Sequence, residues 1–171
     1  MADVGSNPFE ALSAVNALSQ PADKYINDSS IELAWAIKAH EHAEVFFNLI
    51  TSVDPSHLRL CRQDDDIYKK FRDHFPDFII DKIAEEEMKS PAAKEKWRNF
   101  CTEFKGVIQD FNFGTMLRLD CNGIYDSVNS IFVTRIQFLA IEIARNREGF
   151  NKHVYNAACL KNKTTEENKD S

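Results

Sequence analysis

The stretch Ile131–Asn151, IFVTRIQFLAIEIARNREGFN, decides the fold because it joins a nearly continuous apolar run to a dense cluster of charge. Its apolar side chains favour burial, whereas the segment Arg145–Glu148, RNRE, must reach water or a partner. We therefore expect this stretch to anchor one face in a hydrophobic core and to offer its charged end for binding. The residues by themselves indicate a globular domain with an interaction surface and no catalytic signature.

The same stretch has two interpretations as secondary structure. A buried helix over Phe132–Arg147 is favoured by the length of the run, by its alanines and by Gly149, which stands where helices commonly stop. The segment Ile136–Ile143 also has enough β-branched and aromatic residues to form a strand. We predict the helix, and the strand remains the alternative.

Apolar residues at helical spacing, together with capping and stop signals, predict further helices upstream. They are a short amphipathic helix from Pro8 that Pro21 ends, a long helix from Ser29 that Asp54-Pro55 ends, a short helix from Asp64 to Phe75, and a long helix from Pro91 to Phe111 that Gly114 ends. The apolar stripe of the Ser29 helix is expected to consist of Ile31, Trp35, His42, Phe46, Leu49 and Val53.

A small β element is predicted after the Pro91 helix. Apolar Leu117 and Leu119 alternate with Met116 and Arg118, and the pair Asn122-Gly123 is a strong tight-turn signal. We expect a hairpin over Thr115–Val128. The fold class is therefore mainly α, a compact single-domain helical fold with one small β-hairpin.

The chain length of 171 residues fits one globular domain with a real core. We expect an N-terminal segment with a short amphipathic helix at 1–24, a globular domain at 25–158 and a disordered polar tail at 159–171. The tail is predicted because KNKTTEENKDS, from Lys161 onward, contains no apolar residue that could enter a core.

Composition limits the classes of partner. The formal net charge of -6 repels a phosphate backbone, so no direct binding to nucleic acid is expected. The sequence has neither a basic, apolar secretion signal at its N-terminus nor an apolar run of membrane-spanning length. The four cysteines have no CxxC or zinc-ligand spacing and are expected to be free thiols. We predict a cytoplasmic protein, with access to the nucleus, that does not contact membranes.

The sequence offers weak signals for catalytic or metal chemistry. His40 and Glu44 lie four residues apart, and Asp64-Asp65-Asp66 contains an Asp-x-Asp pattern that holds divalent ions in many glycosyltransferases. A surface His–Glu pair and a negatively charged helix N-terminus explain these residues more simply. The five scattered glycines form no phosphate-binding loop, and no nucleophile motif occurs. We assign no catalytic residue, no metal and no cofactor.

Arginines and acids interspersed through the second half remain unexplained by these motifs. They are Arg118, Asp120, Arg135, Glu142, Arg145, Arg147 and Glu148. In one interpretation the arginines form bidentate hydrogen bonds with carboxylates inside the fold and so connect the hairpin to the last helix. In the other they contact an acidic or polar patch on a protein partner. The two interpretations are not exclusive.

Three long blocks resemble a known eukaryotic family. They are SIELAWAIKAHEHAEVFFNLITSVDP (Ser30–Pro55), AKEKWRNFCTEFKGVIQDFNFGTMLRLDC (Ala93–Cys121) and IFVTRIQFLAIEIARNREGFNKHVY (Ile131–Tyr155). They are similar to the family called polysaccharide biosynthesis domain containing protein 1, and the resemblance covers nearly all of Asn16–Tyr155.

The resemblance implies a role in protein biogenesis rather than in sugar chemistry. Family members act at the ribosome as chaperones for the GTPase domain of translation elongation factor 1-alpha, with help from the nascent polypeptide-associated complex. Carried over onto this chain, the protein-binding candidates are Arg118, Asp120, Arg135, Glu142, Arg145, Asn146, Arg147 and Glu148. A carbohydrate-metabolism enzyme or accessory, of methyltransferase or glycosyltransferase type, and a scaffold for another protein are the alternatives.

Overall fold

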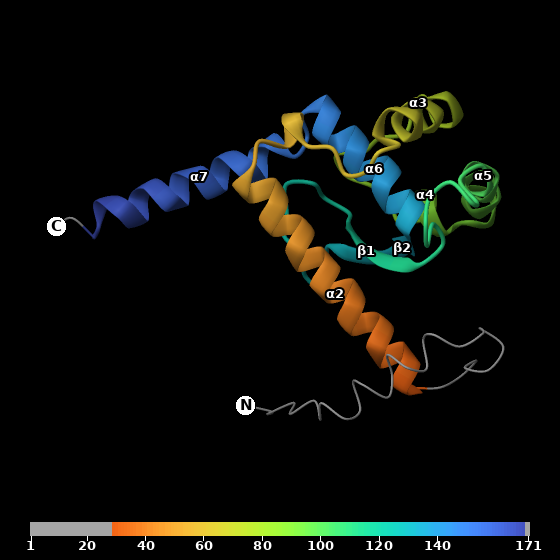
Figure 1. The fold of residues 1–171 in the computed structure, drawn as a ribbon, viewed down its shortest axis with the longest axis horizontal. Coiled ribbons are helices and arrows are strands. Elements are labelled where there is room, and N and C mark those ends of the chain that lie inside the picture. Colours follow the sequence, from red (N-terminus) through yellow and green to blue (C-terminus); the bar gives the residue numbers. More distant parts are fainter. Residues whose placement is uncertain (1–28, 170–171) are drawn as a thin grey trace. The chain divides into compact units, whose positions relative to one another are not determined.

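The computed structural model of the protein describes residues 29–169 (Figure 1). The elements are α2 (Ser29–Ser52), the 3-10 turn η2 (Pro55–His57), α3 (Asp64–His74), α4 (Glu86–Lys89), α5 (Pro91–Thr102), β1 (Gly114–Arg118), β2 (Ser130–Thr134), α6 (Arg135–Glu148) and α7 (Lys152–Glu167). A mainly helical fold with one small antiparallel sheet is therefore confirmed. The short helix predicted from Pro8 and the boundary at residues 24 and 25 lie outside the described residues.

The chain divides into two units, the first ending at Glu41 and the second beginning at His42, within α2. Of the first unit, the structure describes only the start of α2. No helix within residues 29–169 has the length and apolar character that crossing a membrane requires.

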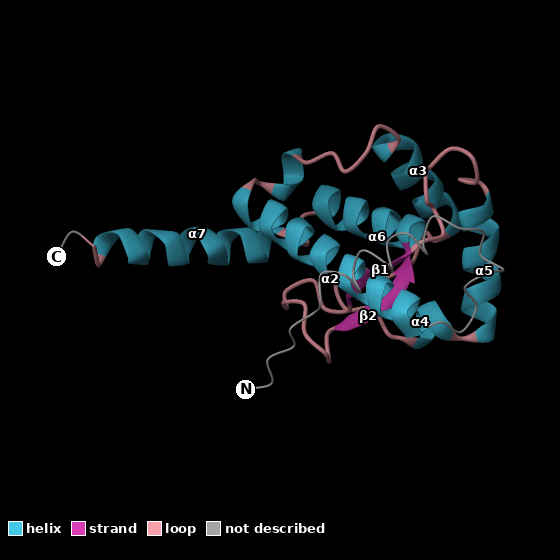
Figure 2. Cartoon of the chain, turned by 60° about the horizontal axis from the view of Figure 1, so that its bottom comes forward, coloured by secondary structure: helices cyan, strands magenta, loops and turns pink. Residues whose placement is uncertain are grey.

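Helix α6 is the centre of the core. Residues 138–146 are buried without interruption, so this helix is enclosed on every side over more than two turns. Figure 2 shows α6 beside the two strands, with α3 and α5 as its helical neighbours. Over Phe138–Ala144 every residue except Glu142 is apolar, and a helix that is apolar nearly all round is internal, which is how the sequence of this stretch determines the architecture.

A cluster of aromatic side chains joins α3 to α5. The Phe75 ring stacks on Trp97 with ring centroids 4.2 Å apart, and the Phe71 ring lies nearly parallel to Trp97 at 5.8 Å and 5.6 Å from Phe75. Trp97 Nε1 donates to the carbonyl of Glu87 at 3.1 Å, which ties the short helix α4 to the cluster. These contacts make the region between α3 and α5 a well-packed aromatic cluster.

The prediction of one continuous helix over Phe132–Arg147 is wrong at its start. Phe132, Val133 and Thr134 belong to β2, and α6 begins only at Arg135. The Thr134 hydroxyl accepts from the Gln137 N–H, and the Gln137 side chain accepts from the Thr134 N–H. This capping box starts the helix abruptly after a β-branched, aromatic run that favours a strand. Gly149 ends α6 in the left-handed conformation, as predicted.

The hairpin prediction was correct for β1 and wrong for its partner. β1 pairs antiparallel with β2, with Gly114 opposite Thr134 and Arg118 opposite Ser130, instead of folding back within Thr115–Val128. The turn at Asn122-Gly123 exists, since the Gly123 N–H donates to the carbonyl of Asp120 at 3.2 Å, but it lies inside a longer loop. A local turn signal does not fix which strand closes the hairpin.

The Asn129 side chain closes that longer loop. Its Oδ1 accepts from the Asp120 N–H at 2.8 Å, and its Nδ2 donates to the carbonyls of Asp120 at 3.1 Å and Ile124 at 2.9 Å. One amide therefore replaces the backbone pairs of a tight hairpin.

Helix α5 starts at the predicted Ser90 cap and Pro91 but ends earlier than predicted, at Thr102. The chain then continues through turns in which Gly106 has a φ of 77° and Asp110 a φ of 56°. Phe104 and Ile108 remain buried in these turns, whereas Val107 is exposed. The apolar spacing correctly indicates that Phe104 and Ile108 face the core, but turns place them there as well as a helix would.

The predicted apolar face of α2 is rotated relative to the observed one. Ala43, Phe46 and Ile50 are buried, whereas Leu49 and Val53 are exposed, as is Trp35. The buried face of α2 therefore includes the predicted Phe46 but turns toward Ala43 and Ile50 instead of Leu49 and Val53.

The predicted disordered tail at 159–171 is helical over most of its length, because α7 continues to Glu167. Residues 160–169 are all exposed, so this part of α7 adds nothing to the core, as its composition indicates.

Candidate functional site

Four of the eight predicted protein-binding residues lie in the interior. Arg118, Glu142 and Arg145 are fully buried, and Asn146 is nearly so. We call the group formed by Arg118, Glu142, Arg145, Asn146 and Asn151 the buried polar cluster. These residues have no free surface for a partner, so the interpretation of the arginines as internal ties describes Arg118 and Arg145.

Glu142 stands at the centre of the buried polar cluster. Its carboxylate accepts from Arg145 Nη1 at 2.6 Å, from Asn151 Nδ2 at 3.0 Å and from Arg118 Nη2 at 3.4 Å. Asn151 Oδ1 accepts a further bond from Arg118 Nη2 at 2.7 Å. Both carboxylate oxygens of Glu142 are therefore occupied by donors from within the chain.

The two arginines of the cluster also hold loop backbone in place. Arg145 donates to the carbonyl of Ile80 at 2.7 Å and to that of Leu119 at 3.1 Å. Arg118 donates to the carbonyls of Cys121 at 2.8 Å and Gly123 at 3.2 Å. Because a guanidinium has five donors in a rigid plane, each arginine can join a carboxylate and two loop carbonyls at once. The cluster thereby fastens the 119–123 loop and the Ile80 segment to α6.

Two guanidinium groups and one carboxylate give the cluster one net positive charge. Aromatic rings offset part of it, because the Arg118 guanidinium lies 5.6 Å from the Phe47 ring centroid and 5.8 Å from that of Tyr125. Burial opposes ionisation of Glu142, but the charges of Arg145 and Arg118 hold its pKa below the ordinary value. Burial, reinforced by the Glu142 charge, raises the pKa of Tyr125 well above its ordinary range.

Arg147 and Glu148 are the exposed members at the C-terminal end of α6, and both are ion-paired. Arg147 pairs with Asp65 and, at 3.4 Å, with Asp64, and its guanidinium lies 5.1 Å from the Tyr68 ring centroid. The side-chain hydrogen bonds from Arg147 and Arg59 hold the pKa of Asp65 below its ordinary value. About one third of the Arg147 side chain stays exposed.

Glu148 forms a bidentate ion pair with Arg72 of α3. Arg72 Nη2 donates to both carboxylate oxygens at 2.7 and 2.8 Å, and Nε donates to one of them at 3.1 Å. Arg72 also donates to the carbonyl of Phe78 at 2.9 Å, so this pair fixes the segment after α3 as well.

Phe150 follows the left-handed turn at Gly149 and is exposed beside these pairs, with 37% of its surface accessible. We call the set Asp65, Arg72, Arg147, Glu148 and Phe150 the α6 C-terminal surface. Of these residues, only Arg147 and Glu148 belong to the set predicted from the sequence to bind a protein. A large apolar residue directly after a helix-ending glycine is the sequence signal that could have pointed to Phe150.

Arg135 and Asp120 lie away from the α6 C-terminal surface. Arg135 is exposed at the first position of α6, about 18 Å along the helix axis from Arg147. Burial, followed by the charge of Arg135, lowers the pKa of His42, whose Nδ1 is 2.9 Å from the Thr115 hydroxyl. Asp120 sits in the 119–129 loop and pairs with Lys82 at 3.7 Å. The eight predicted residues therefore do not form one surface, and binding by exposed Arg135, Arg147 and Glu148 and by half-buried Asp120 stays a prediction.

The three acids Asp64–Asp66 lie in the first turn of α3, as predicted for charges that stabilise a helix N-terminus. Asp64 is buried and accepts from the N–H groups of Leu60 and Cys61, at 2.8 and 3.3 Å. Asp65 pairs with Arg59 and Arg147, and Asp66 with Lys70. Each carboxylate has a protein partner in this arrangement.

Comparison with known proteins gives a consistent result. The family model described as PBDC1 protein matches residues 31–156. The curated human protein named Protein PBDC1 is 57% identical over 146 residues, which are 85% of this chain and 63% of the human one. A Saccharomyces cerevisiae protein named as a PBDC1 homolog is 46% identical over 129 residues, covering 73% of this chain and 88% of its own. This chain thus spans less than two thirds of the length of the human relative.

A solved structure agrees with the fold. The solution NMR structure of a Saccharomyces cerevisiae protein superposes with a TM-score of 0.72 at 41% sequence identity. The match covers 80% of this chain and 97% of the yeast one.

Proposed function

The chain belongs to the PBDC1 family, and from that premise we propose that it is a non-enzymatic protein-binding module, a cotranslational chaperone for the GTPase domain of translation elongation factor 1-alpha. The proposal places it in the cytoplasm, with access to the nucleus, and gives it the ribosome and the nascent polypeptide-associated complex as further partners. The client and these partners come from the family resemblance of the sequence.

The observation that carries the binding role is the composition of the α6 C-terminal surface. Exposed Phe150 lies two residues after Glu148, just beyond the end of α6, and the side chains of Arg147, Glu148 and Arg72 are about one third accessible or less. Arginine and aromatic residues dominate the binding energy of protein interfaces, and polar groups around them exclude water. This surface therefore has the residues that binding to a folding protein requires.

The buried polar cluster supports the same role by making the surface rigid. It fixes α6 to two loops through hydrogen bonds that are shielded from water. A binding surface that is ordered before it meets its partner loses less conformational entropy on binding. In the proposed mechanism, the surface covers apolar or strand-edge regions of the nascent GTPase domain until folding is complete.

The test is co-purification of elongation factor 1-alpha from translating ribosomes with the tagged chain. We expect recovery with wild type and a strong loss with the double variant Arg147→Glu and Phe150→Ser. The matched control is Lys161→Glu, which makes the same charge change on the exposed part of α7. Thermal unfolding of each variant separates loss of binding from loss of the fold. If the wild-type chain recovers no elongation factor under conditions that preserve weak complexes, the chaperone proposal fails.

Two additional measurements address the alternatives. Titration with sugar nucleotides and with S-adenosylmethionine is expected to give no saturable binding, and saturable binding would instead favour a carbohydrate-metabolism enzyme. Mass spectrometry of the co-purified proteins identifies any other protein that the chain serves as a scaffold.

A further inference from the structure

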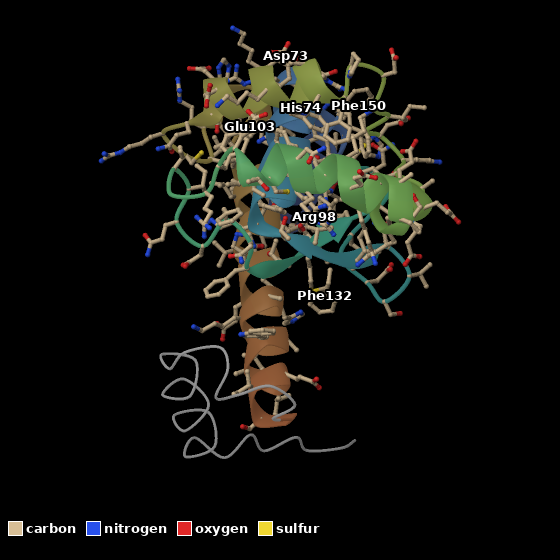
Figure 3. All side chains as sticks on the ribbon, turned by 90° about the vertical axis from the view of Figure 1, so that its right-hand side faces the viewer. Asp73, His74, Arg98, Glu103, Phe132 and Phe150 are labelled. Carbon is tan, nitrogen blue, oxygen red and sulfur yellow. The ribbon has the colours of Figure 1, made fainter. Side chains whose placement is uncertain are left out.

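A groove of about 600 Å³ lies between α5 and the outer edge of β2. Its lining includes Lys89 of α4, Lys94 and Arg98 of α5, and Phe132 of β2. In Figure 3, Arg98 lies between α5 and the strands, and Phe132 projects from the strands. This groove is separate from the α6 C-terminal surface, since none of its lining residues belongs to that surface.

One wall of the groove is an unpaired strand edge. The Arg135 N–H donates to the carbonyl of Phe113 at 2.7 Å, and the Leu119 N–H donates to the carbonyl of Asn129 at 2.9 Å. Bonded and non-bonded pairs alternate along an antiparallel ladder, so Phe132, opposite Met116, belongs to a non-bonded pair. The Phe132 N–H and carbonyl therefore point away from β1, and within residues 29–169 the sheet has no third strand to meet them.

Among the described residues, a lysine side chain contacts that part of the edge. Lys89 Nζ donates to the Phe132 carbonyl at 2.8 Å. Lysine is common at exposed strand edges because its charge opposes unwanted pairing of the edge with strands of other chains. A carbonyl has two lone pairs, so the Phe132 carbonyl can accept from an incoming strand while Lys89 turns to a carboxylate.

The groove is locally positive in a chain of net charge -6. Lys94 and Arg98 lie one turn apart on the groove side of α5, and neither takes part in an ion pair among the described residues. No aspartate or glutamate is among the groove's lining residues in the described chain. Three cations without a facing acid select a negatively charged ligand.

We propose that this groove binds an extended acidic peptide segment of a partner protein, which adds a strand to the free edge of β2. The peptide backbone would pair with the Phe132 N–H and carbonyl. Its alternate carboxylates would meet Lys89, Lys94 and Arg98, and an apolar side chain would pack on Phe132, of which 54% is exposed. Strand addition of this kind takes its affinity from backbone hydrogen bonds and its specificity from alternate side chains.

Two other occupants fit the groove less well. A second copy of the chain pairing through β2 would bring two Lys89 side chains together, which is unfavourable for like charges. A nucleic acid strand would find the three cations but could not use the Phe132 backbone groups as a ladder, and it would meet the net charge of -6.

The inference rests on the proposed protein-binding role but not on the identity of the client. The probe is therefore a synthetic nine-residue peptide in which glutamate alternates with valine and phenylalanine, labelled for fluorescence anisotropy with the full chain. We expect saturable binding that weakens roughly tenfold or more in the variant Lys94→Glu with Arg98→Glu. The control Lys161→Glu with Lys163→Glu makes the same charge change on the exposed part of α7 and should bind as wild type does.

A second probe tests the strand pairing itself. The same peptide with methyl groups on alternate backbone nitrogens keeps its charges but cannot form the ladder, and we expect it to bind at least about tenfold more weakly. The proposal is overturned if the methylated peptide, or a peptide with lysine in place of glutamate, binds as tightly as the original acidic peptide. It is also overturned if an oligouridine binds more tightly than that peptide. A protein that is dimeric by light scattering and is made monomeric by Phe132→Glu overturns it as well.

Failure here is distinguishable from failure of the proposed function. If the peptide does not bind but elongation factor 1-alpha still co-purifies with the chain, only the groove inference fails. If the peptide binds but elongation factor 1-alpha does not co-purify, the proposed client is wrong and the groove inference holds.

Discussion

Glu142 and Arg145, one turn apart on α6, form an ion pair of 2.6 Å in which both side chains are completely buried. Removing charge from water costs free energy that only a well-matched partner offsets, so such a pair is stable as a unit and unstable when broken. With Arg118 on the other side, Glu142 is the only carboxylate in contact with these two buried guanidinium groups among the described residues.

Glu142→Gln should lower the free energy of unfolding by about 3–5 kcal/mol, because it leaves two buried guanidinium groups without a counter-charge. Urea denaturation followed by circular dichroism measures the change. Glu148→Gln is the matched control, since it removes a carboxylate from the partly exposed pair with Arg72 and should cost about 1 kcal/mol or less. Similar losses for the two variants would contradict the assignment of Glu142 as the centre of the buried polar cluster.

The depressed pKa of Glu142 predicts how stability depends on pH. Its stabilising effect is fully present above the ordinary pKa of 4.5 and is lost as the pH falls through the lower value of the folded state. The free energy of unfolding of wild type should therefore fall more steeply than that of Glu142→Gln from about pH 5 to about pH 3. Comparing the two proteins removes the contributions of Asp54 and Asp65, whose pKa values are also lowered by hydrogen bonds to basic side chains. If the free energy of unfolding of the two proteins changes with pH in the same way, the arginines do not hold Glu142 ionised.

Asn129→Ala should open the 119–129 loop, because three hydrogen bonds of one amide close it. The expected loss is about 1–3 kcal/mol, since the Asp120 N–H is left without its acceptor. Hydrogen exchange at the Asp120 amide should accelerate more than exchange at amides of α3, and NMR measures both. Uniform acceleration over the whole chain would indicate global destabilisation instead of a local opening.

Gly149→Ala should destabilise the chain by about 1–2 kcal/mol through backbone strain alone. Gly149 has a φ of 86°, which L-residues adopt at a cost, and an added Cβ would meet nothing within 4 Å. Gly114→Ala is the control, because its Cβ would also meet nothing within 4 Å but its φ is not positive. Thermal unfolding should separate the two, and an unchanged Gly149→Ala protein would contradict the role of this turn.

The sequence predicts the helices best where local signals agree with each other. Ser90 with Pro91 starts α5, the acids at Asp64–Asp66 start α3, and Gly149 ends α6, each at the predicted place. These signals act within one turn of backbone, so no distant contact is needed to interpret them.

Features that depend on distant contacts could not be predicted in the same way. The start of α6 is set by β2, which in turn exists because β1 pairs with it from more than ten residues upstream. The burial of Arg118 and Arg145 depends on Glu142, Asn151 and loop carbonyls that come together only in three dimensions. Composition placed these arginines near a core but could not say which of them point inward.

The position of α6 after α3 and α5 in the sequence has a consequence for the protein's own synthesis. The side chains of α3 and α5 leave the peptidyl-transferase centre well before residues 135–148, which provide their central packing partner. Chains are made from the N-terminus, so the interior is completed only after residues 135–148 have been added, and a product truncated before this helix leaves α3 and α5 without their packing partner.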